Sequence, residues 1–171
     1  MSSFGPDTYG DPCRECGFAW SITEEAAAQL IAGAPGRYRQ LLQGARGDEK
    51  PPEATWPVVA YVAHVCDNLR IWAERLAGVV AGRGLIVPYD QDALAEVKNY
   101  EELPLAATLW SLGRAAGDWA AAWAPVQGRD DLVLVHPEMG EQRMRGVIAL
   151  VAHDTGHHAW DVERAVQGMA G

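Results

Sequence analysis

The sequence predicts an all-α protein, a four-helix bundle that follows an irregular N-terminal arm. Four long segments carry apolar residues at spacings of three and four, which is the period of an α-helix. Only one short stretch, residues 132–145, looks extended. The 171 residues are close to the length of one ordinary domain. We therefore expect the arm over residues 1–19 and the bundle over residues 20–171.

The first long helix is expected to begin at Ser21, because Ser21 and Glu24 have the spacing of a capping box. Pro35 lies too deep in this segment to be a first-turn proline, and a glycine stands on each side of it. Proline removes a helical hydrogen bond and clashes with the preceding turn. We therefore predict a kink or break near residues 33–36 before the helix continues to about Leu42.

The second long helix is expected to open near Thr55, with Pro57 in its first turn, and to end at the glycines of residues 82–84. One short helix is predicted over residues 90–100. The third long helix should span about Pro104 to Trp123, since Pro125 stops it. The stripe of the second long helix consists of Tyr61, His64, Asn68, Trp72 and Leu76.

The last helix is expected from about Gly146 to Gly168, after two short extended pieces around a turn. Two histidines stand in the middle of its stripe, although histidine is neither a strong helix former nor a common core residue. The stripe consists of Leu150, His153, His157, Trp160 and Arg164.

A divalent metal ion would explain these histidines. His153 and His157 lie one helical turn apart, the spacing that lets two imidazoles share one ion. His64 is the histidine on the stripe of the second long helix, so three imidazoles converge if the two helices face each other. Three nitrogen ligands with an open fourth position are typical of catalytic zinc, and imidazole also suits nickel, iron or copper. The alternative is that these histidines are only hydrogen-bonded or solvated.

Two carboxylates are spaced along the helices so that each could accept a hydrogen bond from one of these histidines. Asp161 follows His157 by four residues and Asp67 follows His64 by three, so each could accept the distal imidazole N–H. Asp154 is expected to point off the stripe.

Other polar residues near the stripe are given smaller roles. We expect His158 at the surface or in a hydrogen bond, and His136 in solvent or at the mouth of a site. A substrate pocket would be lined by residues one or two turns from the ligands, with Arg164 as a candidate anion clamp. These pocket candidates are Tyr61, Trp160 and Arg164.

The arm contains the motif CRECG, in which Cys13 and Cys16 have the spacing that lets two sulfurs reach one ion. The motif could form a second, structural metal site, a redox-active dithiol or two idle thiols. The arm could also fold over the histidine site and offer a thiolate there. Cys66, two residues after His64, should point away from the histidines and could meet the arm. Three cysteines do not make a disulfide framework.

The chain resembles the DinB/YfiT-like superfamily of metal-binding four-helix bundles over roughly residues 20–168. The matching pieces are WPVVAYVAHVCDNL, NYEELPLAATLWSL and HPEMGEQRMRGVIALVAHDTGHHAWDVERA. The resemblance implies that His64, His153 and His157 are the metal ligands. The superfamily includes bacillithiol- and mycothiol-dependent transferases and isomerases, and proteins described as metal-dependent hydrolases.

Together these observations favour a divalent-metal-dependent enzyme that acts on a small molecule. The first expectation is S-transfer or isomerisation with a low-molecular-weight thiol of the bacillithiol or mycothiol type, on zinc before nickel, iron or copper. The alternatives are a metal-dependent hydrolase, a non-catalytic metal- or small-ligand-binding stress-response protein, and a plain bundle that acts by dimerisation. A homodimer is possible in each case.

Composition excludes several other classes. The net charge of −9 and the absence of a basic run argue against nucleic-acid binding. No apolar run is long enough for a membrane helix, and the N-terminus does not resemble a secretory signal, so a cytoplasmic location is expected. Neither a nucleophile elbow nor a glycine-rich phosphate loop occurs.

Overall fold

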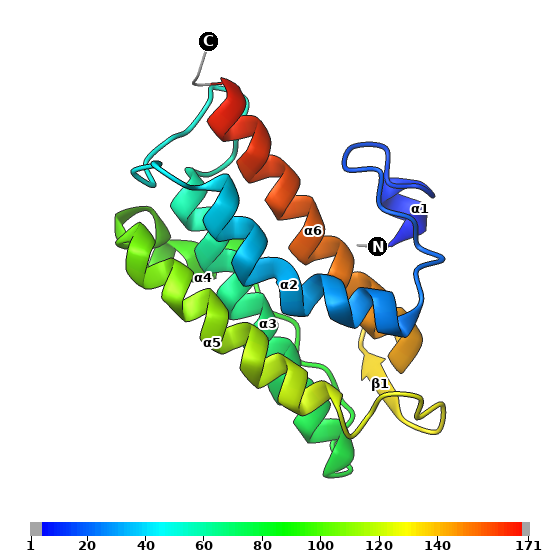
Figure 1. The fold of residues 1–171 in the computed structure, drawn as a ribbon. Coiled ribbons are helices and arrows are strands. Elements are labelled where there is room, and N and C mark those ends of the chain that lie inside the picture. Colours follow the sequence, from blue (N-terminus) through cyan, green and yellow to red (C-terminus); the bar gives the residue numbers. More distant parts are fainter. Residues whose placement is uncertain (1–4, 169–171) are drawn as a thin grey trace.

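The computed structural model describes residues 5–168, and four long helices form its bundle (Figure 1). They are α2 (Glu24–Leu41), α3 (Val58–Val80), α5 (Leu105–Trp123) and α6 (Met144–Gly168). Both α2 and α3 pack against α5 and α6, so α2 and α3 lie diagonally across the bundle although they are consecutive long helices. The all-α four-helix bundle predicted from the periodicity is confirmed.

Short elements join and cover the long helices. They are α1 (Pro6–Tyr9), α4 (Gln91–Val97), the 3-10 turn η1 (Tyr100–Glu102) and an antiparallel hairpin of β1 (Val133–His136) and β2 (Gly140–Arg143). The hairpin is hydrogen-bonded to the segment that follows α3. The Val135 amide donates to the Gly84 carbonyl (2.7 Å), and the Ile86 amide donates to the Val135 carbonyl (2.8 Å). The two extended pieces predicted from sequence are therefore present.

The arm differs from the expectation of a fully irregular segment, since α1 forms one helical turn inside it. The blue arm lies beside α6 in Figure 1. Residues 1–4 of the predicted arm and 169–171 of the predicted bundle region lie outside the described residues.

The predicted start of the first long helix was wrong by a few residues. Thr23 caps α2, because its hydroxyl accepts the Ala26 amide (3.2 Å), whereas Ser21 lies before the helix. The predicted break is also absent, and α2 is continuous through Pro35. Its buried residues Ile31 and Tyr38 lie on either side of the proline, so packing holds both halves in one helix despite the lost hydrogen bond.

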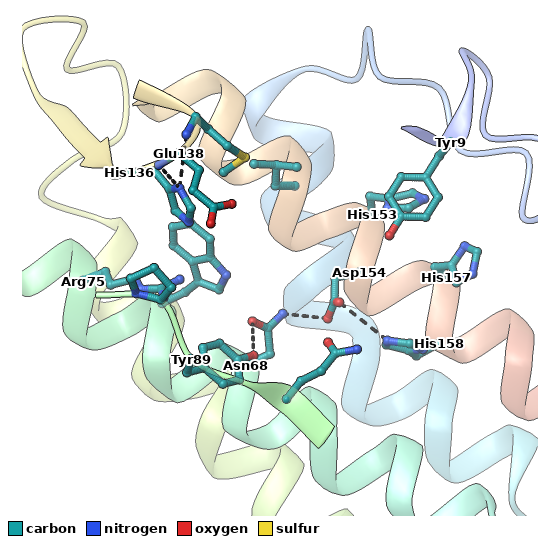
Figure 2. Close-up of a pocket in the computed structure, with 15 residues that line it drawn as sticks. Tyr9, Asn68, Arg75, Tyr89, His136, Glu138, His153, Asp154, His157 and His158 are labelled. Atoms are coloured by element: carbon teal, nitrogen blue, oxygen red, sulfur yellow. Dashed lines mark hydrogen bonds and ion pairs between the residues drawn. The ribbon is translucent and has the colours of Figure 1, made fainter. Parts of the chain in front are cut away.

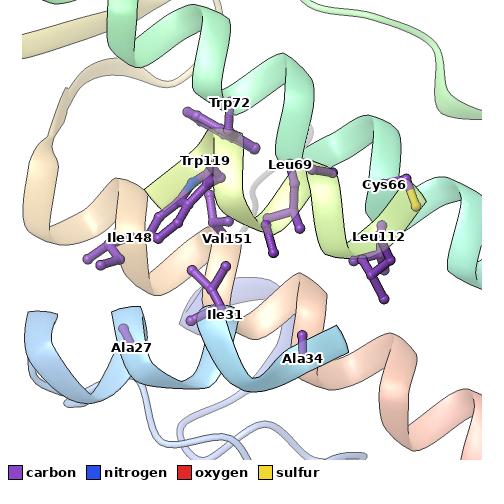
Figure 3. Packing of buried hydrophobic residues seen from close by; sticks show 14 of the residues in the cluster. Ala27, Ile31, Ala34, Cys66, Leu69, Trp72, Leu112, Trp119, Ile148 and Val151 are labelled. Carbon is purple, nitrogen blue, oxygen red and sulfur yellow. The ribbon is translucent and has the colours of Figure 1, made fainter. Parts of the chain in front are cut away.

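The core lies between the four helices (Figure 3). Ile31 of α2 points toward Trp119 of α5 and Val151 of α6, and all three are at most 1 % exposed. Trp119 and Trp123 stack with ring centroids 5.7 Å apart, one turn from each other on α5. This packing fixes the rotation of α6, and therefore the direction in which each of its polar side chains points. No helix within residues 5–168 has the length and apolar character required to cross a membrane.

Candidate metal centres

Helix α6 presents two pairs of metal-ligand residues rather than one. His153 and His157 form the first pair, and Asp154 and His158 form the second, each with a spacing of four. A step of one residue rotates the direction of a side chain by about 100°, so the two pairs face different neighbours. The first pair faces the arm and the second faces α3.

The second pair meets His64 of α3 in what we call the α3–α6 cluster: His64, Asp154 and His158. The Asp154 Oδ1 atom lies 3.5 Å from His64 Nε2 and 3.6 Å from His158 Nε2. The two imidazole rings are nearly perpendicular, with centroids 4.8 Å apart. One potential ligand atom from each residue lies within 4.8 Å of the other two.

Neighbouring polar groups orient the α3–α6 cluster. His158 Nδ1 faces Asp161 Oδ2 at 2.9 Å, which leaves its Nε2 directed at Asp154. The Asn68 amide donates to Asp154 Oδ2 (2.6 Å) and accepts from the Tyr89 hydroxyl (3.4 Å), as Figure 2 shows. A carboxylate on the far nitrogen of a histidine is the usual support for a metal ligand.

The mutual attraction of Asp154 and His158 shifts their pKa values in opposite directions. Burial opposes the ionisation of Asp154, but the charges of His64 and His158 hold its pKa well below its usual range. Burial also lowers the pKa of His158, but Asp154 and Asp161 outweigh it and raise that pKa to about 9. The positive charge of a protonated His158 balances part of the negative charge of Asp154 and Asp161. A bound cation would do the same.

A cavity of about 430 Å³ opens beside the α3–α6 cluster (Figure 2). Asp154 and His158 lie on one wall, and Arg75 and Tyr89 lie on another. The hairpin contributes further polar groups, among them Glu138. A volume of this size suits a small-molecule ligand.

The first pair on α6 meets the arm in what we call the arm–α6 cluster: Cys13, Cys16, His153 and His157. One potential ligand atom from each of the four lies within 4.8 Å of the others. Cys13 Sγ is 3.8 Å from His157 Nδ1, although 144 positions separate the two residues in the chain. The rings of His153 and His157 lie 5.1 Å apart.

Burial shifts the pKa values of ionisable groups of the arm–α6 cluster. It raises the pKa of Cys16 to about 11, with a further contribution from the Cys13 thiol. Burial and the nearby His157 lower the pKa of His153 to about 4, so this imidazole is neutral and able to act as a ligand.

Both donor sets fit a divalent ion, but in different ways. The α3–α6 cluster offers two imidazoles and one carboxylate beside a cavity, as in catalytic zinc or facial-triad iron sites. The arm–α6 cluster offers two sulfurs and two imidazoles, the tetrahedral set of structural zinc. The His153 Nε2 atom supports this reading, because it is buried and has no hydrogen-bond partner among the described residues.

The structure thus divides the three histidines predicted as ligands of one ion. His153 and His157 lie with Cys13 and Cys16, while His64 lies with a different pair on α6. That pair is not among the predicted ligands, because Asp154 is expected off the stripe and His158 at the surface or in a hydrogen bond; the hydrogen bond of His158 to Asp161 is present. The pair's spacing of four between two ligand-type residues was the available signal.

The supporting residues proposed from sequence are also rearranged. Asp161 lies 2.9 Å from His158 but 4.0 Å from His157, so its nearer partner is the neighbouring histidine. Within residues 5–168, Asp67 makes no hydrogen bond to His64 and instead accepts hydrogen bonds from Lys98 and Tyr100.

Cys66 and His136 lie outside both clusters. Cys66 is buried on α3, where its Sγ donates to the Thr108 carbonyl (3.6 Å), so it lies away from the histidines as expected but does not join the arm's metal-ligand group. His136 lies on the cavity wall, and its Nδ1 accepts the amides of Glu138 and Met139.

The three pocket candidates lie together. A second hollow of about 460 Å³ touches His157 and His158 from the side of the loop before α3. The Arg164 guanidinium stacks over the Trp160 ring, 4.6 Å from its centroid. The hollow's walls include Tyr61, Trp160 and Arg164.

The fold matches the solved structure of YfiT from Bacillus subtilis, which is described as a probable metal-dependent hydrolase with an unusual four-helix bundle topology. The match has a TM-score of 0.75 and 19% sequence identity, and it covers 88% of this chain and 91% of that one. The chain therefore has a DinB/YfiT-like fold. No protein-family model matches the sequence. No curated protein is significantly similar to it.

Proposed function

We propose that this chain, which shares the fold of YfiT, is a metal-dependent enzyme that hydrolyses a small molecule at the α3–α6 cluster. The observation that carries the proposal is the pairing of a three-residue ligand set with an adjacent cavity of about 430 Å³. Catalytic sites keep a coordination position open for water or substrate, whereas structural sites are closed by a fourth protein ligand. The description of YfiT as a probable metal-dependent hydrolase agrees with this choice.

The residues that would hold the ion are His64, Asp154 and His158, with zinc as the first candidate metal. A divalent ion there supplies Lewis acidity, which polarises a substrate oxygen and makes a bound water or thiol more acidic.

The chain's own residues orient this site and the substrate. Asp161 holds the Nδ1 side of His158, and Asn68 holds one oxygen of Asp154. Both ligand side chains therefore keep their free donor atoms directed at the same point. Arg75 and Tyr89 on the cavity wall are suited to an anionic or polar group of the substrate. Glu138 of the hairpin is the second carboxylate that lines the cavity, besides Asp154, and is our candidate for proton transfer.

Transfer or isomerisation with a low-molecular-weight thiol, of the bacillithiol or mycothiol type, is the second candidate. The observation in its favour is that two hollows, of about 430 and 460 Å³, both reach His158. A reaction with two substrates needs space for both beside one ion. Arg164 in the second hollow could bind a carboxylate of the thiol. A cytoplasmic location and a homodimer remain predictions.

The test begins with protein stripped by chelator and reloaded with zinc, nickel, manganese or iron. The loaded protein is assayed with a panel of small esters, amides and lactones, and with thiol–electrophile pairs. We expect hydrolysis by the loaded protein, and a loss of at least ~100-fold in kcat/KM for the His64→Ala/His158→Ala variant. Elemental analysis should show that this variant loses one metal per chain, while His136→Ala, a histidine outside both clusters, loses none.

Three outcomes would contradict the proposal. Equal activity in the wild type and His64→Ala/His158→Ala would show that hydrolysis takes place at another site. Tight metal binding with no turnover of any panel member would favour the non-catalytic metal-binding protein instead. Turnover of thiol pairs alone would select S-transfer over hydrolysis.

A further inference from the structure

The CRECG motif of the arm is folded into a compact turn. The Cys13 amide donates to the Phe18 carbonyl (2.8 Å), and the Gly17 amide donates to the Cys13 carbonyl (2.9 Å). Gly17 has a φ of +73°, a left-handed conformation that glycine adopts without steric cost. This turn places both sulfurs in the same ligand group as the α6 histidines.

Aromatic residues of the arm enclose the histidine pair from the other side. The rings of Tyr9 and Trp20 lie 4.7 Å and 4.5 Å from the His153 ring, and Phe18 lies 5.3 Å from it. The Trp20 indole also donates to the Gly10 carbonyl (2.8 Å), which closes the arm on itself. The rings of the arm therefore cover His153, which is only 5 % exposed.

The burial of the cluster is unfavourable unless something satisfies its polar atoms. Cys13 and His153 are only 2 % and 5 % exposed. The His153 Nε2 atom has no hydrogen-bond partner within residues 5–168, and leaving a buried polar group unpaired is unfavourable. A metal ion coordinated by this nitrogen would remove that cost.

The far side of His157 is arranged as for a ligand. Its Nε2 lies 3.5 Å from Glu15 Oε2 and 4.0 Å from Asp161 Oδ2, while its Nδ1 faces Cys13. Carboxylates that receive the distal N–H of an imidazole hold the other nitrogen deprotonated and directed at the ion.

From these contacts we infer that Cys13, Cys16, His153 and His157 bind a structural zinc ion that clamps the N-terminal arm onto α6. Two thiolates neutralise the charge of the ion, so the complete centre is neutral and compatible with burial. Donor atoms around tetrahedral zinc lie roughly 3.3–3.8 Å apart, and a small contraction of the cluster from its present span reaches that range.

The clamp also has a consequence for the neighbouring cavity. Tyr9 packs against His153 and is one of the residues that line the cavity (Figure 2). Fixing the arm therefore fixes one wall of that cavity. The inference concerns a second ion and does not depend on the chemistry proposed at the α3–α6 cluster.

Cobalt substitution distinguishes the two sites, because only the arm–α6 cluster has sulfur ligands. Reduced full-length protein without metal is titrated with Co²⁺, and the thiolate-to-cobalt charge-transfer band is followed together with metal content. We expect two ions per chain in the wild type, and one ion with no charge-transfer band in Cys13→Ser/Cys16→Ser. The His64→Ala/His158→Ala variant should also bind one ion but retain the full band.

Controls keep the result interpretable. Cys66→Ala, which removes a buried thiol outside the cluster, should leave the band unchanged. If the double cysteine variant does not fold, Cys16→Ser decides, because Cys16 is partly exposed and its thiol contributes less packing than that of Cys13. That variant should bind Co²⁺ at least ~10-fold more weakly at this site, with about half the band intensity.

Limited proteolysis provides a readout that is independent of spectroscopy. With zinc bound, the arm should resist cleavage between residues 5 and 20, and chelation or the Cys13→Ser/Cys16→Ser change should make it at least ~10-fold more sensitive. A wild-type protein that shows no thiolate–cobalt band, or whose band survives loss of both cysteines, would overturn the inference.

Discussion

Replacing Asp67 by asparagine should destabilise the protein without removing a metal ligand. Asp67 lies on α3 with only 8 % of its side chain exposed, and it accepts hydrogen bonds from the Tyr100 hydroxyl (2.6 Å), the Lys98 ammonium (2.8 Å) and the Arg70 guanidinium (3.3 Å). It therefore ties α3 to the segment between α4 and α5. Burial opposes its ionisation, but Lys98, Tyr100 and Arg70 hold its pKa below the usual value.

The expected loss is about 2 kcal/mol. Tyr100 is only 2 % exposed, so its hydroxyl would lose a charged acceptor that water does not easily replace, at a cost of roughly 1.5–2 kcal/mol. Lys98 and Arg70 are 50 % and 38 % exposed in their side chains, and they regain water, so each adds only a few tenths of a kcal/mol. For a chain of this length the total corresponds to a decrease in Tm of about 4–8 °C.

The pH dependence identifies charge as the cause. Because the folded-state pKa of Asp67 is lower than its unfolded value of about 3.9, its stabilisation is complete above that pH and disappears as the pH falls through the folded-state pKa. Urea unfolding of metal-free wild type and Asp67→Asn is measured from pH 7 to pH 3. The gap in unfolding free energy should be constant near neutral pH and close below about pH 4.

A matched control is Asp131→Asn, which removes an exposed carboxylate that pairs with Arg129 at 2.7 Å. This change should leave the unfolding free energy nearly unaltered, since exposed ion pairs contribute little. The reasoning would be refuted if Asp67→Asn were as stable as the wild type at pH 7, or if the gap were the same at pH 3.

Three further predictions concern the bundle, and chemical unfolding at pH 7 checks each of them. Ile31→Ala should cost about 2–5 kcal/mol, because the side chain is fully buried, and a loss below 1 kcal/mol would mean that the core collapses around it. Gly84→Ala should cost about 1–3 kcal/mol, because its new Cβ would lie 2.7 Å from the Val133 carbonyl oxygen. Its control Gly33→Ala, with open space and a helical backbone, should stabilise the protein by about 0.5–1 kcal/mol. Equal effects of the two changes would contradict the steric argument. Tyr38→Phe should cost about 1 kcal/mol, because its buried hydroxyl donates to a backbone carbonyl of α6 (3.0 Å), and an unchanged midpoint would show that this bond has no net value.

Most of the fold could be predicted from local sequence patterns. The end of α3 and the start of α5 follow from the glycines after Val80 and from Pro104, because these residues end or start helices through their own backbone geometry. Helix α3 begins at Val58, after Pro57, and not near Thr55 as expected. The errors occurred where packing outweighs local preference. Pro35 signals a break, but the buried residues on both sides of it keep α2 continuous.

For the candidate site, only the residue types and their spacing along the chain were predictable. The spacing of four on α6 predicts paired ligand-type residues, and CxxC predicts two sulfurs that can reach one ion; in the structure both sulfurs lie in one group with His153 and His157. The grouping was not predictable, since Cys13 and His157 are 144 positions apart in the chain.

Periodicity and side-chain chemistry are enough to predict the four helices and the ligand-type residues spaced along α6. The helix packing alone shows that His153 and His157 face the arm while Asp154 and His158 face His64. Adjacent residues on a helix point about 100° apart, so a rotation of α6 by that angle would exchange one pair for the other. That rotation is set by the packing of α6 against α2 and α3, which no local pattern in the chain specifies.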